Sequence, residues 1–399
     1  MMSKYSFNII AKRIQREVFF LLKPLLRRLF YYLPAKKSRI CFNNFAGKGF
    51  GDNPKYIAEE IHLRDSSYQL FWLVNYMSNY EFPAYIHAVD IDSIKALYIR
   101  ATSEIWISNI RNDHPVKKKE SQLYLQTWHG GFGWKRVEAD AQDILSREYI
   151  TQAKYDGHIT DGILVYGKRQ EELFKRAFWL NEKTEILRFG LPKNDHLINS
   201  IKNTDKENDV IRKKLGLDEH TIYVLYAPTF RDDGSLEGYK LNFEEIIKAL
   251  EKKLKKEVNV IVRLHPNVSA QSKFISYNRS IINGTFFPDA QELSVVCDCL
   301  ITDYSSILYN FVLMHKPVLL CALDLQDYID KRGLLPDFFD SPFPMAKTNE
   351  ELLMLIKHFN IDEYYQKVDD YFLKNPIYDD GHAAEKTVTW LLNRVRKKN

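Results

Sequence analysis

The chain has 399 residues, of which 45% are hydrophobic and 14% aromatic, so it exceeds the usual size of one domain and can bury two substantial cores. Its four cysteines make no disulfide framework or complete zinc site, and we expect reduced, buried thiols in a cytosolic protein. The net charge is +5, but residues 1–39 carry +9 and the remaining 360 residues carry −4. A basic arm on a mildly acidic body, without a recognised nucleic-acid module, argues against nucleic-acid binding.

The basic arm interleaves apolar and cationic residues between positions 14 and 33. Its longest uncharged run is far shorter than the roughly 20 residues of a membrane span, and Pro24 would kink a helix there. It also lacks the small-residue cleavage site of a signal peptide. We predict that residues 1–37 form a basic amphipathic helix on an anionic membrane surface. The alternative is a helix packed on the first domain with its charges solvated.

After this arm, apolar runs alternate with polar, helix-like segments. Strands are expected at 39–44, 68–74, 84–89, 104–108, 122–126, 163–166 and 186–189, and helices from 55, at 137–146 and at 168–178. This alternation is typical of a parallel sheet covered by helices. Residues 190–195 have the composition of a turn, and the polar stretch 200–219 marks a boundary between domains at 38–200 and 201–399.

The second half repeats the pattern. Strands are expected at 221–226, 258–263, 299–302 and 317–321, with helices at 243–256, after Ser306 to about Met314, and over most of 349–396. The predicted fold class is therefore α/β, with two Rossmann-like domains.

Two glycine-rich turns follow strands in the first half. Residues 45–54 include Lys48, Asp52 and Asn53, but their glycine spacing is not that of the dinucleotide fingerprint, and an ordinary loop is slightly favoured. Residues 126–135 place His129 at a strand end, then Gly130 and two further glycines, then Lys135. Such a turn can hold an anion beside a base, although a structural histidine in a plain loop is an equal alternative.

Three strand ends of the second half deliver polar side chains. In an open α/β sheet they converge, because ligands bind at the carboxyl ends of the strands. Hydroxyls and amides at a helix start can hold phosphate oxygens, and guanidinium groups add bidentate contacts. Each residue alone has a structural alternative, such as capping a helix or pairing on the surface. Together they predict a phosphate or diphosphate ligand: Thr229, Arg231, Arg263, His265, Asp303, Ser305 and Ser306.

Four ordered motifs resemble the CDP-glycerol glycerophosphotransferase family, which builds teichoic acids and related capsular polymers. They are Trp-His-Gly at 128–130, Tyr-Ala-Pro-Thr-Phe-Arg at 226–231, Arg-Leu-His-Pro at 263–266 and Thr-Asp-Tyr-Ser-Ser at 302–306. Residues 45–54, 190–195 and 380–386 match the family's pattern too, so the resemblance covers roughly 39–390. Two stretches depart from it, at 131–135 and at His382 and Ala384, so the acceptor side is expected to differ and the tail receives no catalytic role.

The resemblance implies a two-domain fold of the glycosyltransferase B type. It also implies transfer of glycerol phosphate, or ribitol phosphate, from a CDP-alditol to a hydroxyl of a lipid-linked glycan or polymer, with release of CMP. The enzyme would work as a peripheral protein on the cytoplasmic face of the cell membrane. No acidic cluster in the sequence demands a metal, so we expect no metal and no cofactor. His129 would be the general base and His265 a second catalytic candidate. The donor side would comprise Thr229, Arg231, Arg263, Asp303, Ser305 and Ser306, and the acceptor side Lys48, Asp52, Asn53, Gly130 and Lys135.

Two other functions fit the same features. A nucleotide-sugar glycosyltransferase of this fold keeps the diphosphate site but attacks a sugar carbon, and a non-catalytic membrane scaffold keeps only the fold. The residues leave open glycerol against ribitol, one addition against many, teichoic acid against capsule, the acceptor and the oligomeric state.

Overall fold

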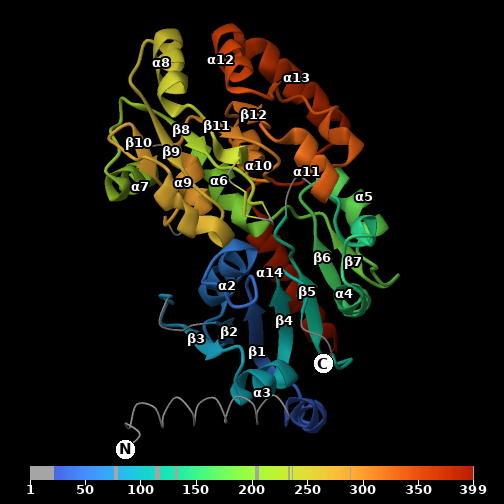
Figure 1. Cartoon of the computed structure of the whole chain (residues 1–399). Helices are drawn as coiled ribbons and strands as arrows, with labels where there is room; N and C mark the ends of the chain where they lie inside the picture. The colour runs from blue at the N-terminus through green and yellow to red at the C-terminus, as the bar shows by residue number, and fades with distance from the viewer. Residues whose placement is uncertain are drawn as a thin grey trace, which may run out of the picture.

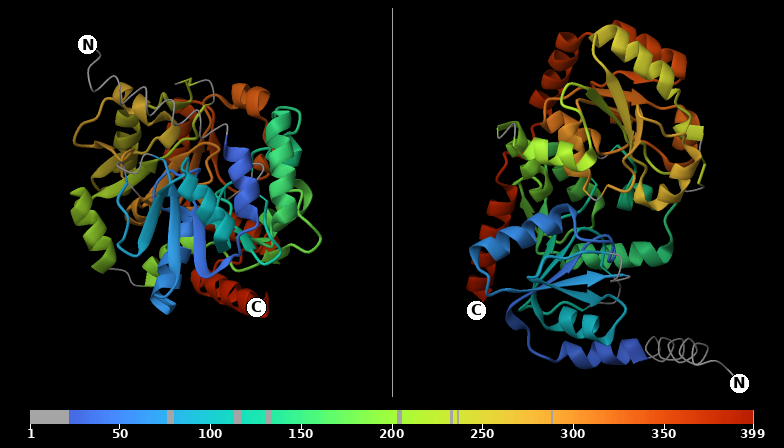
Figure 2. Two further views of the ribbon diagram at one scale, coloured as in Figure 1. Left: turned by 90° about the horizontal axis from the view of Figure 1, so that it is seen from below. Right: turned by 90° about the vertical axis from the view of Figure 1, so that its left-hand side faces the viewer.

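The structure, a computed structural model, describes residues 22–75, 80–112, 117–130, 134–202, 206–231, 234–235, 237–287 and 289–398. It has two lobes, each built on a parallel sheet with helices packed against it (Figures 1 and 2). The expected α/β class with two parallel sheets is confirmed.

The first lobe carries a seven-stranded sheet in the order β3-β2-β1-β4-β5-β6-β7. Its strands are β1 (Lys36–Asn43), β2 (Gln69–Val74), β3 (Ile86–Asp90), β4 (Ser103–Ser108), β5 (Leu123–Gln126), β6 (Gly162–Leu164) and β7 (Glu185–Leu187). The helices between them are α2 (Asp52–Arg64), α3 (Ile94–Thr102), the short 3₁₀ turn η2 (Glu138–Ala141), α4 (Arg147–Ile159) and α5 (Lys168–Ala177). The connection to the second lobe contains α6 (Pro192–Lys202) and α7 (Lys206–Leu215).

The second lobe carries a six-stranded sheet in the order β10-β9-β8-β11-β12-β13. Its strands are β8 (Ile222–Tyr226), β9 (Val258–Val262), β10 (Ile281–Asn283), β11 (Cys299–Thr302), β12 (Val318–Cys321) and β13 (Met345–Ala346). Its helical elements are η3 (Glu237–Tyr239), α8 (Phe243–Leu254), η4 (Pro266–Phe274), α9 (Ala290–Val296), α10 (Leu308–Leu313), α11 (Leu325–Arg332), η5 (Pro336–Phe338), α12 (Asn349–His358) and α13 (Ile361–Lys374). The last helix is α14 (Ala383–Lys398).

The central strands carry consecutive apolar residues where both of their faces are covered. In β1, Ile40 and Phe42 point into one core while Cys41 points into another on the opposite face, and all three are buried. Such double burial is characteristic of parallel sheets. It explains why continuous apolar runs, rather than alternating ones, marked most strands in the sequence.

The order of both sheets reverses beside their first strand, between β1 and β4 and between β8 and β11. In open α/β sheets, ligands bind outside the carboxyl ends of the strands at this switch point. The two sheets direct these ends at each other: Lys135, which follows β5, donates to Thr229 Oγ1 at 3.4 Å just after β8. Lys135 also forms an isolated antiparallel bridge with Leu334 of the second lobe.

Some expected elements differ. The predicted helix at 137–146 is only η2, and the helix of this region is α4, capped by Ser146, whose Oγ accepts from Tyr149 N at 3.2 Å. The turn at 190–195 is shorter than expected because α6 begins at Pro192. Proline suits the first turn of a helix, where its missing N–H has no intrahelical partner to lose.

The last helix returns to the first lobe. Trp390 Nε1 donates to Glu185 Oε2 at 2.9 Å, and Arg64 Nη1 donates to Thr389 Oγ1 at 2.7 Å. Figure 1 shows α14 running alongside the first sheet. The chain therefore crosses between the lobes twice, and α14 packs against elements of the first lobe.

The predicted basic helix lies partly outside the described residues, which begin at 22. Residues 22–31 are helical and lie at the end of the first lobe remote from the second (Figure 1). Leu25 and Leu29 of this helix are 63% and 60% exposed. Within the described ranges, no helix combines the length and apolar character that crossing a bilayer requires.

Candidate active site

The turn between β1 and α2 is compact and internally bonded. Asn44 Nδ2 donates to the carbonyl oxygens of Lys48 and Gly49 at 3.1 and 3.2 Å. Gly47 has φ +89°, and a Cβ atom there would lie 2.6 Å from the backbone nitrogen of Asn75. Only glycine fits this close approach. The glycine-rich turn is thus an ordered scaffold that carries Lys48 toward the other lobe.

The His129 imidazole follows β5 and is held in one tautomer. Its Nδ1 lies 2.6 Å from the backbone oxygen of Asn109, at the end of β4. A carbonyl oxygen can only accept, so Nδ1 carries the proton and Nε2 keeps its lone pair. Burial lowers the pKa of His129 below 6.5; the Lys193 cation acts in the same direction, and the Asn109 carbonyl and Asp52 act against it. Nε2 is therefore a free base at neutral pH.

Asp52 and Asn53 lie behind this histidine. Asp52 Oδ2 pairs with Lys193 Nζ at 2.8 Å, and the same Nζ donates to the backbone oxygen of His129 at 3.1 Å. Asn53 is fully buried; its Nδ2 donates to Trp128 O at 3.1 Å and its Oδ1 accepts from Lys193 N at 3.2 Å. Both residues, predicted on the acceptor side, thus contact the segment that carries the histidine. Gly130 follows His129, and its carbonyl accepts from Gln170 Nε2 at 2.8 Å.

The second lobe presents His265 to this group. Burial lowers the pKa of His265 to about 4, and four neighbours add to the effect: Lys135, Lys48, His129 and Arg263. Lys48, His129 and Lys135 belong to the first lobe, while Arg263 follows β9. The predicted residues thus meet across the lobes as a cluster of cations and imidazoles, which is suited to phosphate groups.

A family model described as CDP-glycerol:poly(glycerophosphate) glycerophosphotransferase matches residues 25–393. The chain belongs to this family. The resemblance drawn from the four motifs is thereby confirmed.

Named relatives agree with the family. The chain is 31% identical to the teichoic acid poly(glycerol phosphate) polymerase of Staphylococcus epidermidis, over 88% of this chain and 50% of that protein. It is 28% identical to the teichoic acid glycerol-phosphate transferase of Staphylococcus aureus, over 95% of this chain and 97% of that one. The solved wall teichoic acid polymerase TagF superposes with a TM-score of 0.82 at 26% identity, covering 98% of this chain and 99% of that one. The chain spans about half the length of the Staphylococcus epidermidis polymerase.

Arg231 and Asp303, both predicted on the donor side, form an ion pair with each other. Arg231 is 7% exposed, and its Nη2 pairs with Asp303 Oδ2 at 2.9 Å while its Nε pairs with Asp324 Oδ2 at 2.5 Å. Its Nη1 donates to Thr229 O at 2.6 Å, and Asp303 Oδ1 accepts from Thr229 N at 2.8 Å. Tyr304 and Tyr328 stack beside the guanidinium. This network holds the turn after β8 in place.

The remaining donor-side residues lie at strand ends, as expected. Arg263 Nη1 donates to the carbonyls of Gly284 and Phe287 at 3.2 and 2.5 Å, which ties β9 to the segment after β10. Ser305 and Ser306 are half-buried in the turn that precedes α10.

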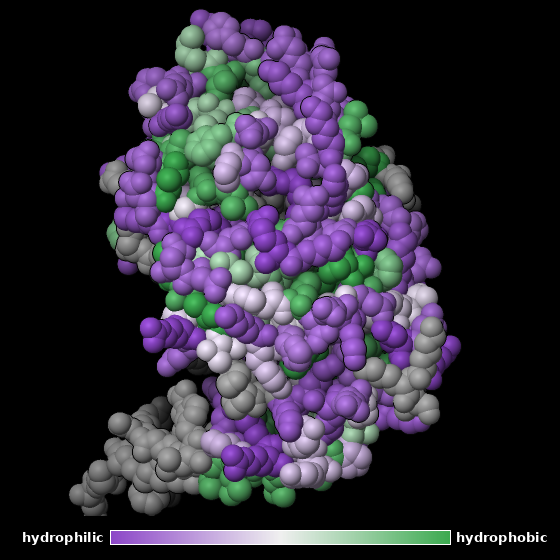
Figure 3. Space-filling view, turned by 90° about the vertical axis from the view of Figure 1, so that its right-hand side faces the viewer, coloured by the Kyte–Doolittle hydropathy of each residue, from purple (hydrophilic) through white to green (hydrophobic). Residues whose placement is uncertain are grey.

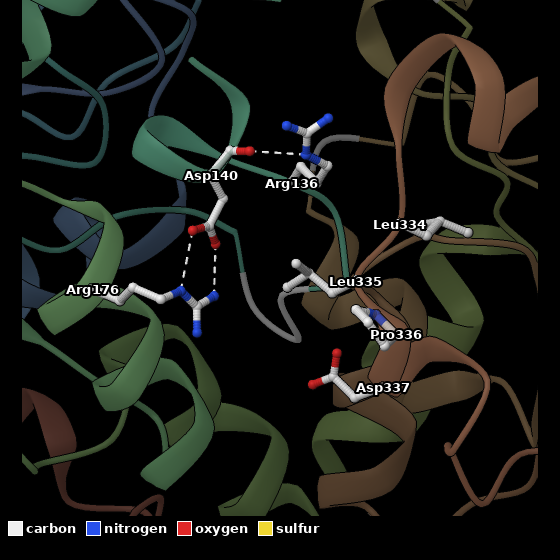
Figure 4. Close-up of a pocket in the computed structure, with 7 residues that line it drawn as sticks. All are labelled: Arg136, Asp140, Arg176, Leu334, Leu335, Pro336 and Asp337. Carbon is white, nitrogen blue, oxygen red and sulfur yellow. Dashed lines mark hydrogen bonds and ion pairs between the residues drawn. The ribbon is translucent and has the colours of Figure 1, made fainter. Parts of the chain in front are cut away.

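Beside Lys135, residues of both lobes line an open pocket of about 510 Å³ (Figure 4). Its two guanidinium groups converge on one aspartate: Arg136 Nε donates to Asp140 O at 2.8 Å, and Arg176 pairs with the Asp140 carboxylate at 2.6 Å. Leu334, Leu335 and Pro336 form the opposite wall. Because the cations are already paired, the pocket is polar rather than strongly cationic.

Sequence reasoning missed Asn109 and Lys193. Asn109 had a detectable signal, since it ends a strand beside the switch point. Lys193 lies within the 190–195 motif, which the family resemblance had marked without a role. Neither residue type by itself points to a catalytic task.

Proposed function

We propose that this protein transfers glycerol phosphate, or ribitol phosphate, from a CDP-alditol to a hydroxyl of a membrane-linked glycan or polymer and releases CMP. The products would be teichoic acid or capsular polysaccharide. The observation that carries the proposal is the His129 imidazole, with a free Nε2, beside a cationic cluster drawn from both lobes. The names of its relatives, and a TagF variant structure soaked with CDPG, support the donor class.

The chemistry needs only one displacement. The acceptor hydroxyl attacks the β-phosphorus of the donor, its proton passes to His129 Nε2, and the bond from that phosphorus to the CMP oxygen breaks. Lys48, Lys135 and Arg263 stabilise charge on the transferring phosphoryl group and on the departing CMP. No covalent enzyme intermediate, cofactor or metal is required, so we propose that EDTA leaves the activity intact.

We assign the two lobes to the glycosyltransferase B type. Both sheets have the doubly wound strand order, and their carboxyl ends meet at the cationic cluster. A UDP-GlcNAc 2-epimerase of Methanocaldococcus jannaschii shares the fold with a TM-score of 0.53 at 11% identity. This likeness supports the architecture and says nothing of the substrate.

We also propose that the protein is peripheral on the cytoplasmic face of the membrane, where a lipid-linked acceptor is presented. Exposed Leu25 and Leu29 share helix 22–31 with Lys23, Arg27 and Arg28. Figure 3 shows hydrophobic atoms gathered at this lower end of the molecule. An apolar face flanked by cations suits an anionic lipid surface.

The test is CMP release from CDP-glycerol and CDP-ribitol, with and without a lipid-linked acceptor, by the native protein and by His129→Gln. We expect acceptor-dependent release that the substitution lowers by about 10² to 10⁴. Absence of release from both donors, by folded protein, would refute the proposal, and UDP-sugars would then be screened. Absence of any CDP-dependent thermal shift as well would favour a scaffold.

A further inference from the structure

We propose that Lys193 is a positioning residue for His129. It ties the backbone of the histidine to the Asp52 carboxylate, and so holds the imidazole against Asn109. The kinetic consequence rests on the proposed function, whereas the structural consequence does not.

Lys193 lies in the first turn of α6, where the chain leaves the first lobe, and joins three segments at once. Its Nζ contacts Asp52 Oδ2 at 2.8 Å and His129 O at 3.1 Å, and its backbone nitrogen donates to Asn53 Oδ1 at 3.2 Å. The Lys193 and Asp52 side chains are each 11% exposed. A shielded ion pair that also satisfies a carbonyl is held far more firmly than a surface pair.

Asn109 completes the support from the opposite side. It is fully buried; its Nδ2 donates to Asn44 Oδ1 at 2.7 Å and to Asp52 Oδ1 at 3.3 Å. Its Oδ1 accepts from Phe45 N at 2.9 Å, while its backbone oxygen accepts from the His129 ring. Asp52 is thus held at one oxygen by Asn109 and at the other by Lys193. Asn109, Asp52 and Lys193 are therefore linked to one another and to His129 by a continuous series of contacts.

The backbone of this region requires such support. Asp52 has φ +54° and Trp128, which precedes His129, has φ +52°. Residues other than glycine keep the left-handed conformation at a cost of order 1–3 kcal/mol each, and do so only where their surroundings enforce it. Removing the Lys193 contacts would let the histidine segment relax away from Asn109.

The two members of the pair affect the imidazole in opposite directions. The charged groups that act on His129 are Asp52 at the start of α2, Lys193 of α6 and Glu138 of η2, and His265 of the second lobe faces it. The Lys193 cation lowers the pKa of His129, and the Asp52 carboxylate raises it. Lys193→Met should therefore raise this pKa, and Asp52→Asn should lower it. Opposite shifts would show that both charges act on the ring, while the Nδ1–H tautomer of His129 reports whether the ring is still held against Asn109.

The test compares native protein with Lys193→Met, Asp52→Asn and the conservative Lys193→Arg. Lys118→Met is the matched control, because Lys118 pairs with Asp161 at 2.5 Å at the opposite end of the sheet with a similarly shielded side chain. We expect Lys193→Met to lower kcat roughly 10- to 100-fold while KM for CDP-glycerol changes by less than about threefold. Lys193→Arg should recover most of kcat, and Lys118→Met should keep it.

Nitrogen-15 NMR of histidine-labelled protein gives the second readout. Native His129 should carry its proton on Nδ1, this tautomer should be depleted in Lys193→Met, and the ring should titrate in opposite directions in Lys193→Met and Asp52→Asn. Native kcat in Lys193→Met, or pKa shifts of the same sign, would overturn the inference. If the native protein releases no CMP, the proposed function fails, yet the NMR comparison still decides the positioning role. Should Lys193→Met not fold, Asp52→Asn and Lys193→Arg provide the same comparison.

Discussion

His129 and His265 of the cationic cluster differ in the pH at which each becomes cationic. His265 has a pKa of about 4, lowered first by burial and then by neighbouring cations, so it is neutral under all ordinary conditions. His129 has a pKa below 6.5, lowered chiefly by burial. Because only the neutral imidazole accepts a proton, CMP release should be constant at neutral pH and fall as pH drops through the pKa of His129. Rates measured from pH 5 to 8 should place the midpoint below 6.5. A midpoint above 7 would assign the titration to another group.

Arg231 is a structural residue by its contacts, and its removal should appear in stability. Arg231→Met leaves Asp303 and Asp324 as unpaired, buried carboxylates, which costs on the order of 3–5 kcal/mol. Urea unfolding measures this cost. The control is Arg176→Met, which breaks a pair whose arginine side chain is 54% exposed and should cost less than about 1 kcal/mol. If Arg231→Met and Arg176→Met lost the same free energy of unfolding, Arg231 would contribute little to stability, and a ligand-binding role would explain it better.

At the scale of elements, the start of α6 is hydrogen-bonded to the start of α14, so the two segments that connect the lobes contact each other. Asp195 Oδ1 and Oδ2 accept from the first backbone nitrogens of α14, those of Ala383 and Ala384, at 2.8 and 2.7 Å. Asp379 accepts from Leu191 N at 2.7 Å and from Tyr309 OH at 2.9 Å. The 190–195 and 380–386 segments, both of which match the family's pattern, therefore contact each other and form one joint.

This joint should make stability depend on pH. Burial raises the pKa of Asp379 to about 7, against roughly 3.9 in an unfolded chain, so the folded state keeps its proton longer. Asp379 therefore imposes no penalty below pH 4, and a growing one as pH rises toward 7. Asp379→Asn removes the ionisation, so the Tm of the variant relative to that of native protein should increase between pH 5 and 8. A Tm difference independent of pH would show that Asp379 does not titrate there.

Elements were predicted correctly where burial requires consecutive apolar residues in the sequence. Strands covered on both faces, such as β8 and β12, are uninterrupted apolar runs, whereas β10 and β13 are too short to stand out. Helix α4 was missed because only three of its residues are buried, which leaves little apolar periodicity. The motifs located polar residues at strand ends correctly. They did not reveal that Arg231 and Asp303 neutralise each other, because side-chain pairing depends on the spacing between strands rather than on order in the chain.

At the scale of the whole molecule, the basic arm should determine membrane binding. Removing residues 1–34 deletes seven of the ten basic residues before position 40, together with exposed Leu25 and Leu29. Lys36, Lys37 and Arg39 remain. We expect the truncated protein to lose sedimentation with anionic vesicles, and the full chain to bind neutral vesicles weakly. Unchanged binding to anionic vesicles would place the lipid contact on another surface.

The cationic cluster exists only while the two lobes are apposed, so contacts between them should govern donor affinity. Lys55 of α2 pairs with Asp289 of the second lobe at 3.0 Å, and Tyr56 OH reaches the same carboxylate at 3.3 Å. Lys55→Met breaks the pair but leaves Asp289 to cap α9 through Gln291 N at 2.8 Å. The contacts of Lys135 with Thr229 and Leu334 remain to hold the lobes loosely together.

We therefore expect Lys55→Met to fold normally, with a larger radius of gyration in small-angle scattering without ligand. Its KM for CDP-glycerol should rise roughly twofold to fivefold with kcat nearly unchanged, because a partly exposed pair contributes about 1 kcal/mol or less. Saturating CDP-glycerol should restore the native radius, since the donor's phosphates draw cations of both lobes together. A raised KM with an unaltered radius would mean that Lys55 contacts the donor itself. If KM and the radius of gyration were both unchanged, the contacts of Lys135 with Thr229 and Leu334 would be enough to hold the lobes together.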